Sequence, residues 1–126
     1  MTELPCSVDI RGRFTLPIAV RDLLFGPLVE QDSKGCLKLY SADIADAKTV
    51  ELMEGKRGER LRRTMRRRFG RAFLLTPDSQ GRVLIPCYMR QRAGIEKGVV
   101  IIETDDHRWE IWAEDRLQRY RRDVCA

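Results

Sequence analysis

Short apolar stretches recur along the chain, each two to five residues long and each bounded by polar or turn-forming residues. Stretches of this length and composition predict β-strands rather than amphipathic helices. In each half, one stretch is followed by a proline and a short helical pattern, near residues 17–24 and 86–93. Each half therefore reads β-β-α-β-β. The expected strands are residues 6–8, 14–16, 28–29 and 36–40 in the first half, and 73–75, 83–85, 99–103 and 109–112 in the second.

The two halves also share sequence motifs. The pattern D-x-x-G-R-x-x-[LI]-P-x-x-x-R occupies residues 9–21 and again residues 78–90, at an offset of 69. A second match lies downstream, where LKLYSAD at 37–43 aligns with WEIWAED at 109–115 at an offset of 72. Two matches in the same order and at nearly the same offset indicate that the chain is a tandem duplication of one unit.

Each copy of the motif begins with a predicted turn. An aspartate three residues before a glycine, as in Asp9 and Gly12, is typical of a type I turn. Because strand-like residues flank each turn, we expect a β-hairpin with its tip at residues 10–11 in the first half and 79–80 in the second. Arg13 in the first half and Arg82 in the second therefore come directly after the turns.

One unit of about 40 residues is near the lower limit for independent folding and cannot bury its own sheet. We therefore expect the two copies to pack together as one compact domain, in an interleaved, closed barrel without exposed strand edges. The first repeat with its trailing helix would span residues 1–54. An arginine-rich helix, the second repeat and a C-terminal helix would span residues 55–126. The predicted fold class is β-rich α+β.

Proline and glycine mark the expected ends of the two short helices. Pro17 and Pro86 suit the first helical position, where the missing N–H costs nothing. Gly26 and Gly94 suit the position that ends each helix. Three longer helices are expected outside the repeated units: residues 42–54, residues 59–71 with Leu61, Met65, Phe69 and Ala72 at helical spacing, and residues 114–123 with Leu117 and Tyr120 facing inward.

The positive charge of the chain is concentrated in one segment. Residues 56–71 hold nine lysines or arginines and one acid, Glu59, a charge of +8. Since the whole chain carries +5, the other 110 residues carry −3 (5 minus 8). Such a concentration favours a polyanionic partner, because neutralising phosphates releases condensed counterions. Two other interpretations stay open: an exposed helix face in solvent, and contact with an acidic patch on a neighbouring subunit.

Cysteine and histidine usage argues against a metal site and against catalysis. Cys6, Cys36, Cys87 and Cys125 are widely spaced, and His107 is the one histidine, so no pattern of zinc ligands is present. We expect free, mostly buried thiols in a reducing compartment. One histidine in a turn supplies no Ser-His-Asp or Cys-His set, and no glycine-rich phosphate loop occurs. The expectation is a protein with no catalytic residues, no metal and no cofactor, that is, not an enzyme.

Hydropathy favours a soluble protein of the cytoplasm. No apolar run approaches the roughly 18 residues needed to span a bilayer, and the start MTELPCSVDIRGR lacks the apolar core of a signal peptide. Tyr40, Trp109 and Trp112 recur at matched positions of the two halves, which indicates core packing rather than stacking on nucleobases.

The duplicated Asp-x-x-x-Arg within D-x-x-G-R-x-x-[LI]-P resembles the hallmark motif of the MraZ family, the regulators of the bacterial division and cell-wall gene cluster. Residues 36–40 (CLKLY), residues 109–112 (WEIW) and the arginine-rich segment before the second motif resemble the same family. The resemblance implies an AbrB-like swapped-hairpin barrel, doubled within one chain, that assembles into ring-shaped homo-oligomers. It further implies a cytoplasmic, nucleoid-associated repressor that binds direct repeats in the promoter of its own operon.

The resemblance also implies which residues meet double-stranded DNA. Carried over position by position, the DNA-binding surface comprises Asp9, Arg11 and Arg13 in the first copy, and Asp78, Gln80 and Arg82 in the second. A purely structural interpretation stands beside it, in which each aspartate and arginine form a salt bridge that braces the turn. An antitoxin-like or scaffold protein, whose main partner is another protein, is the alternative function.

Overall fold

The computed structural model describes residues 3–22, 27–41, 58–60, 63, 72–105 and 108–125. Within these ranges each half has the predicted order β-β-α-β-β, and the fold class is β-rich α+β with antiparallel strands. The strands are β1 (Glu3–Ser7), β2 (Arg13–Thr15), β3 (Pro27–Gln31), β4 (Leu37–Ser41), β5 (Ala72–Leu74), β6 (Arg82–Leu84), β7 (Gly98–Asp105) and β8 (Arg108–Ala113), and the helices are α1 (Ile18–Arg21), α4 (Cys87–Ala93) and α5 (Glu114–Cys125).

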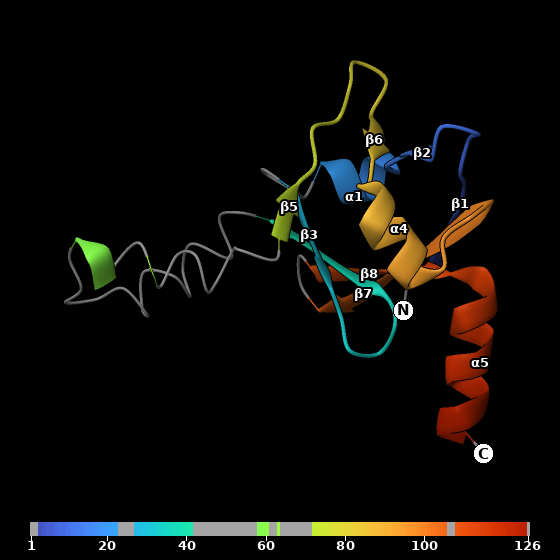
Figure 1. Cartoon of the computed structure of the whole chain (residues 1–126). Coiled ribbons are helices and arrows are strands. Elements are labelled where there is room, and N and C mark those ends of the chain that lie inside the picture. The colour runs from blue at the N-terminus through green and yellow to red at the C-terminus, as the bar shows by residue number, and fades with distance from the viewer. Residues whose placement is uncertain are drawn as a thin grey trace.

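The strands of the two halves interleave (Figure 1). One sheet has the order β1-β7-β8-β4-β3-β5, and a second, two-stranded sheet joins β2 to β6. By the repeat, β1, β2, β3 and β4 of the first half are equivalent to β5, β6, β7 and β8 of the second. Exchanging every strand with its equivalent gives the same two sheets again: the pair β1-β7 becomes β5-β3, while the pairs β4-β8 and β2-β6 are unchanged. The duplication seen in the sequence is therefore also an approximate two-fold symmetry of strand pairing.

The prediction that the strands flanking each turn pair as a hairpin is wrong. β1 pairs with β7, and β2 pairs with β6, so the chain changes sheets at the turn. A backbone hydrogen bond of 2.8 Å from Asp9 to Arg13 closes the turn itself. The physical reason lies in β2 and β6, whose central residues Phe14 and Val83 face each other across the halves and are almost fully buried.

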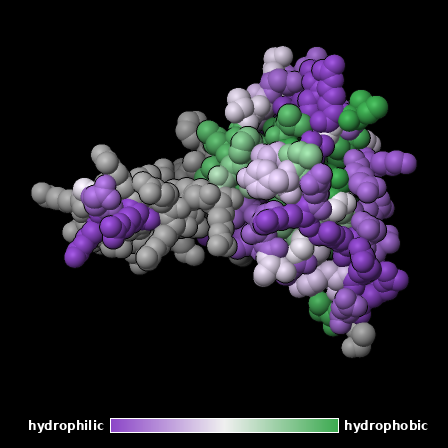
Figure 2. All heavy atoms as spheres, viewed as in Figure 1, coloured by the Kyte–Doolittle hydropathy of each residue, from purple (hydrophilic) through white to green (hydrophobic). Residues whose placement is uncertain are grey.

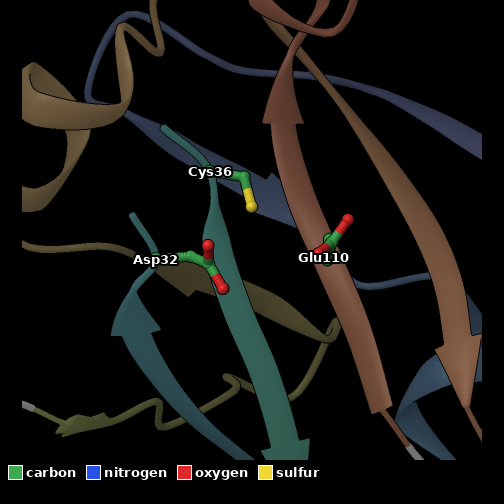
Figure 3. Close-up of side chains that lie close together, drawn as sticks. All are labelled: Asp32, Cys36 and Glu110. Atoms are coloured by element: carbon green, nitrogen blue, oxygen red, sulfur yellow. The ribbon is translucent and has the colours of Figure 1, made fainter. Parts of the chain in front are cut away.

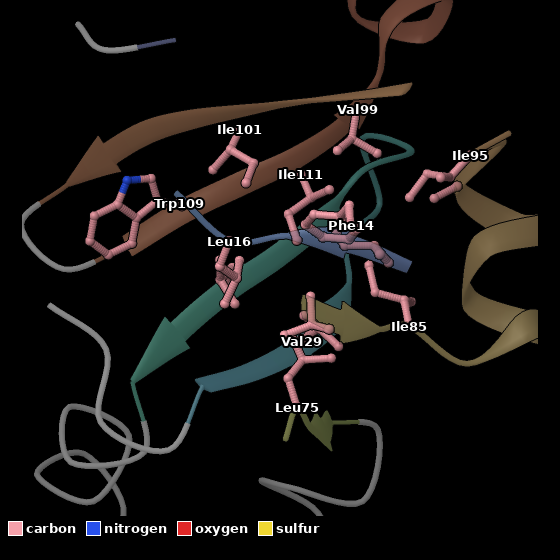
Figure 4. Packing of buried hydrophobic residues seen from close by; sticks show 14 of the residues in the cluster. Phe14, Leu16, Val29, Leu75, Ile85, Ile95, Val99, Ile101, Trp109 and Ile111 are labelled. Atoms are coloured by element: carbon pink, nitrogen blue, oxygen red, sulfur yellow. The ribbon is translucent and has the colours of Figure 1, made fainter. Parts of the chain in front are cut away.

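The main core lies between the six-stranded sheet and the β2–β6 pair. Figure 4 shows Phe14 beside Ile111 of the large sheet, in the same cluster as Ile85 and Ile101. Burial of one such aliphatic side chain contributes about 1.5–3 kcal/mol. Alternation along β8 sends Trp109, Ile111 and Ala113 to this core and Trp112 to the opposite face. A second cluster there joins α5 to the sheet and consists of Cys36, Ile102, Trp112 and Leu117.

The aromatic residues that recur at matched positions belong to the interior. Tyr40, Trp109 and Trp112 are 7%, 3% and 1% exposed, which confirms that they pack rather than form a stacking surface. Leu117 of α5 is buried as predicted, whereas Tyr120 stays 37% exposed with its ring 5.0 Å from that of Trp112.

The two short helices begin one residue later than predicted. Pro17 and Pro86 are the N-caps of α1 and α4, with extended ψ angles of 145° and 142°, rather than the first helical residues. Gly94 ends α4 in the left-handed region, as predicted.

The expected helix at 42–54, most of the one at 59–71, and Gly26 lie outside the described residues. Within the described ranges, no helix has the length and apolar character needed to cross a bilayer.

Candidate nucleic-acid interface

The first Asp-x-x-Gly-Arg turn is held together by its own aspartate. Asp9 Oδ1 accepts hydrogen bonds from the backbone N–H of Arg11 (2.9 Å) and of Arg13 (2.8 Å). The Gly12 N–H donates to the Asp9 carbonyl at 2.9 Å, and Gly12 adopts a φ of +83°, which glycine tolerates without steric cost. The motif therefore needs aspartate as the acceptor and glycine for the left-handed backbone.

The same carboxylate fixes the arginine that follows the turn. Arg13 Nε donates to Asp9 Oδ2 at 3.0 Å. The second copy repeats the arrangement: Arg82 Nε lies 2.7 Å from Asp78 Oδ2, while Asp78 Oδ1 accepts from the backbone of Gln80 and Arg82. Each aspartate and arginine therefore form the salt bridge that the structural interpretation requires, and this pair braces the turn.

Bracing uses only one edge of each guanidinium. The Arg13 and Arg82 side chains are 30% and 38% exposed. Among the described residues, none accepts a hydrogen bond from their terminal Nη groups. The aspartate consequently orients a planar, permanently charged donor while its outer edge stays available to an external acceptor.

Both turns project from the same side of the molecule, away from α5 (Figure 1). They lie at opposite ends of the β2–β6 pair, because Arg13 is paired with the last residue of β6 and Arg82 with the last residue of β2. Figure 2 shows hydrophilic side chains over the loop that leads into β6. The tip residues Ile10, Arg11, Ser79 and Gln80 are exposed, and Ile10 is completely so.

A third turn shows which part of the motif is merely structural. Between β3 and β4, Gly35 donates to the Asp32 carbonyl, and Asp32 Oδ1 accepts from the backbone of Lys34 at 2.8 Å. This turn shares the backbone hydrogen bonds of the other two and the hydrogen bond from the second residue after the aspartate to its carboxylate, but Cys36 stands where they have arginine. The Asp-x-x-Gly framework is therefore a general turn, and the arginine distinguishes the two candidate DNA-binding turns.

Sequence reasoning overlooked two further arginines at these turns. The sequence alone assigns no role to Arg21 and Arg90, the last residues of the two motif copies. In the structure Arg90 lies against Gly12 of the other half, and Arg21 lies against Gly81, close enough that a Cβ at either glycine would overlap the guanidinium. The signal was present in the repeat, as the arginine shared at the end of both motif copies.

One group of potential metal ligands exists among the described residues. Asp32, Cys36 and Glu110 place their ligand atoms within 4.8 Å of one another (Figure 3). Their carboxylates are already engaged, since Lys34 pairs with Glu110 and Lys38 Nζ lies 3.6 Å from Asp32. Burial raises the pKa of the Cys36 thiol to about 12, so it stays protonated at neutral pH. Both carboxylates of this group are therefore occupied by lysines, and its thiol is protonated in the structure as it stands.

The other thiols differ in exposure. Cys6 is half-buried and Cys87 is exposed, so the expectation of mostly buried cysteines fails at Cys87. His107 lies outside the described residues.

The two turn aspartates have a measurable electrostatic signature. The backbone N–H groups of Arg13 and Arg82 are the largest cause that lowers the pKa of Asp9 and Asp78, respectively. Because the folded pKa is depressed, the turns contribute stability that is present above the unfolded pKa and lost as pH falls through the folded pKa.

Carboxyl-carbon NMR titration is expected to give Asp9 and Asp78 midpoints below about 3.9, the ordinary aspartate value. Midpoints of Asp9 and Asp78 at or above the ordinary aspartate value would show that the turns are not formed in solution.

Known proteins resemble the chain over most of its length. The family model described as "MraZ protein, putative antitoxin-like" matches residues 68–124. A protein of Desulfosudis oleivorans named transcriptional regulator MraZ is 35% identical over 119 residues, which cover 90% of this chain and 80% of that protein. Proteins of the same name from Heliobacterium modesticaldum and Thioalkalivibrio sulfidiphilus are 32% and 34% identical over 95% and 91% of this chain, and over 85% and 80% of their own lengths.

The family model covers the second copy of the motif, and the named relatives match at least 90% of the chain, which confirms the resemblance noted in the sequence. The relatives are named as regulators of transcription, which agrees with the expectation that the chain is not an enzyme. The chain belongs to the MraZ family of transcriptional regulators.

Proposed function

We propose that this chain is a sequence-specific DNA-binding transcriptional regulator that meets double-stranded DNA with its two Asp-x-x-Gly-Arg turns. One observation carries the proposal: the same braced turn is built twice on one side of the molecule, each time with an arginine whose outer edge is available. Asp9 and Asp78 orient Arg13 and Arg82, while Arg11 and Gln80 extend from the tips.

A guanidinium held in this way suits two kinds of contact with DNA. It can donate to phosphate oxygens, which position a protein on the duplex, or to the O6 and N7 atoms of guanine in the major groove. The two tips differ in charge, since Arg11 stands where the second copy has Gln80. We therefore propose that the two turns contribute unequally to binding.

The finer points that the family resemblance implies are part of the same proposal. We propose that the interleaved strands form an AbrB-like swapped-hairpin barrel, and that residues 1–54 and 55–126 act as one compact domain. The operator would be direct repeats in the promoter of the chain's own division and cell-wall operon, with repression as the outcome. A ring of several copies would engage several repeats at once and gain avidity.

Fluorescence anisotropy tests this proposal directly. The purified chain is titrated onto a duplex from upstream of its own gene and onto a shuffled duplex of equal composition. We expect the wild type to prefer the native duplex, and Arg13→Ala/Arg82→Ala to lose at least a factor of about ten in affinity for it, or about 1.4 kcal/mol. Arg119→Ala/Arg122→Ala removes two arginines from α5 and is expected to keep the preference.

The outcomes separate the candidate mechanisms. If the double turn variant stays folded and keeps its preference for the native duplex, the turns are not the recognition surface. If both duplexes bind the wild type equally and with a steep salt dependence, charge alone is acting, through the basic segment at residues 56–71.

A protein partner is the second candidate function, favoured by apolar side chains at the surface. β5 forms one edge of the large sheet and carries Phe73 and Leu74, which are 40% and 54% exposed. Leu84, Tyr88 and Ile18 are also at least 49% exposed. Such residues suit another copy of the chain, as a ring requires, or a different protein. Light scattering of the purified chain distinguishes these partners, because self-association raises the measured mass without any addition.

A further inference from the structure

Arg21 and Arg90 each belong to one half of the chain but lie at the turn of the other half. Arg21 is the last residue of α1 and Arg90 lies in α4, at equivalent positions four residues after Pro17 and Pro86. Figure 1 shows α1 and α4 at the base of the two loops. The Arg90 guanidinium occupies the space beside Gly12 that a larger residue would fill, and that of Arg21 does the same beside Gly81.

Each turn is consequently accompanied by two guanidinium groups from different halves. The first turn has its own Arg13 together with Arg90, and the second has Arg82 together with Arg21. Glycine at the last turn position makes this close approach possible, since both Gly12 and Gly81 are buried beneath the arginine that covers them. The pairing follows the two-fold symmetry of the strands.

The charges of Arg21 and Arg90 are not neutralised by acids in the described part of the chain. Arg90 Nε donates to the Ile85 carbonyl at 2.9 Å, which fixes the plane of its guanidinium. Neither arginine forms a salt bridge with a described residue, and the acids of the turns are engaged by Arg13 and Arg82. Half-buried arginines that are held in place without a carboxylate partner are suited to an anionic ligand.

We propose that Arg21 and Arg90 bind the phosphate backbone of DNA, each completing the turn of the opposite half. The proposal rests on the proposed function, because it takes the two turns to be the surface that meets the duplex. Arg13 and Arg82 then act beside a second cation supplied across the pseudo-symmetry axis. One copy of the motif has only half of such a site, so the site is assembled by the packing of the two repeats.

Salt dependence distinguishes a phosphate-binding role from a packing role. The affinity of Arg21→Gln/Arg90→Gln for the native duplex is measured by anisotropy across a salt series, beside the wild type, Arg21→Lys/Arg90→Lys and the charge-matched control Arg119→Gln/Arg122→Gln. We expect the plot of log affinity against log salt to become shallower by about 0.9 for each phosphate that the glutamine variant no longer binds. The lysine variant and the α5 control are expected to keep the wild-type slope, because they retain the charges at the turns.

A wild-type slope in the glutamine variant, whatever its affinity, would overturn the proposal. If Arg13→Ala/Arg82→Ala loses its preference for the native duplex while the glutamine variant keeps the slope, only this inference fails. If the wild type binds neither duplex, the proposed function fails with it.

A second measurement uses the wild type alone. The Nε–H resonances of its arginine side chains are followed by NMR while native duplex is added. We expect the signals of Arg21 and Arg90 to shift together with those of Arg13 and Arg82, and those of the α5 arginines to stay in place. Stationary Arg21 and Arg90 signals would contradict direct contact.

Discussion

Replacing Trp112 by alanine is expected to lower the free energy of unfolding by about 3–5 kcal/mol. The side chain is 1% exposed and lies in the cluster that joins α5 to the sheet, together with Ile102 and Leu117. Its Nε1–H donates to Glu110 Oε1 at 3.0 Å, and its ring lies 5.0 Å from that of Tyr120. Alanine would remove these interactions and leave a cavity that the surrounding β-sheet cannot close.

Urea denaturation followed by circular dichroism measures this effect, since tryptophan fluorescence itself changes with the substitution. Tyr88→Ala is the matched control, because Tyr88 is an aromatic residue that is 56% exposed on α4. We expect the control to stay within about 0.5 kcal/mol of the wild type. A decrease of less than about 1 kcal/mol in Trp112→Ala would show that α5 is not packed on the sheet as described.

Much of the fold could be predicted from the sequence because the chain repeats itself. The expected strands correspond to β1–β8 with ends shifted by one or a few residues, and the α+β order of each half is as predicted. These predictions depend on short-range signals, namely apolar stretches, prolines and glycines. The helices begin one residue after Pro17 and Pro86 and not at these prolines, because the backbone at each proline is still extended.

Strand pairing could not be predicted in the same way, because it depends on contacts distant in the sequence. The residues on both sides of Asp9–Arg13 have the pattern of a hairpin, yet β1 pairs with β7 and β2 with β6. Local sequence is compatible with both arrangements. The interleaved one buries Phe14 and Val83 of the short strands against the large sheet, which a hairpin with its own β1 would not achieve.

In the candidate site, too, the contacts between residues close in the sequence could be predicted and those between the two halves could not. The salt bridges of Asp9 with Arg13 and of Asp78 with Arg82 link residues four apart, so their spacing alone suggested them. The contacts of Arg90 with Gly12 and of Arg21 with Gly81 link residues of different halves. The repeat marked those arginines as shared, but only the packing of the halves shows what they touch.

Replacing the turn glycines by alanine tests those contacts. Gly12, Gly81 and Gly35 all adopt positive φ angles, of 83°, 79° and 97°. Alanine at any of them costs about 1–2 kcal/mol through the left-handed backbone alone. At Gly35 the nearest atom to an added Cβ is Arg116 Nη1 at 3.7 Å, an ordinary contact, so Gly35→Ala reports the backbone cost by itself.

Gly12→Ala is expected to cost about 1 kcal/mol more than Gly35→Ala, because the new methyl group must displace the flexible end of Arg90 and with it the hydrogen bond to the Ile85 carbonyl. Gly81→Ala must displace the end of Arg21 in the same way. The difference from Gly35→Ala, measured by the same urea denaturation, isolates that displacement. Combining Gly12→Ala with Arg90→Ala should remove the excess cost, since the shortened side chain no longer overlaps the methyl group. If the three glycine variants are equally destabilised, the arginines do not cover the turns. An excess that Arg90→Ala relieves only at Gly12, and Arg21→Ala only at Gly81, would show that each helix arginine serves the turn of the opposite half.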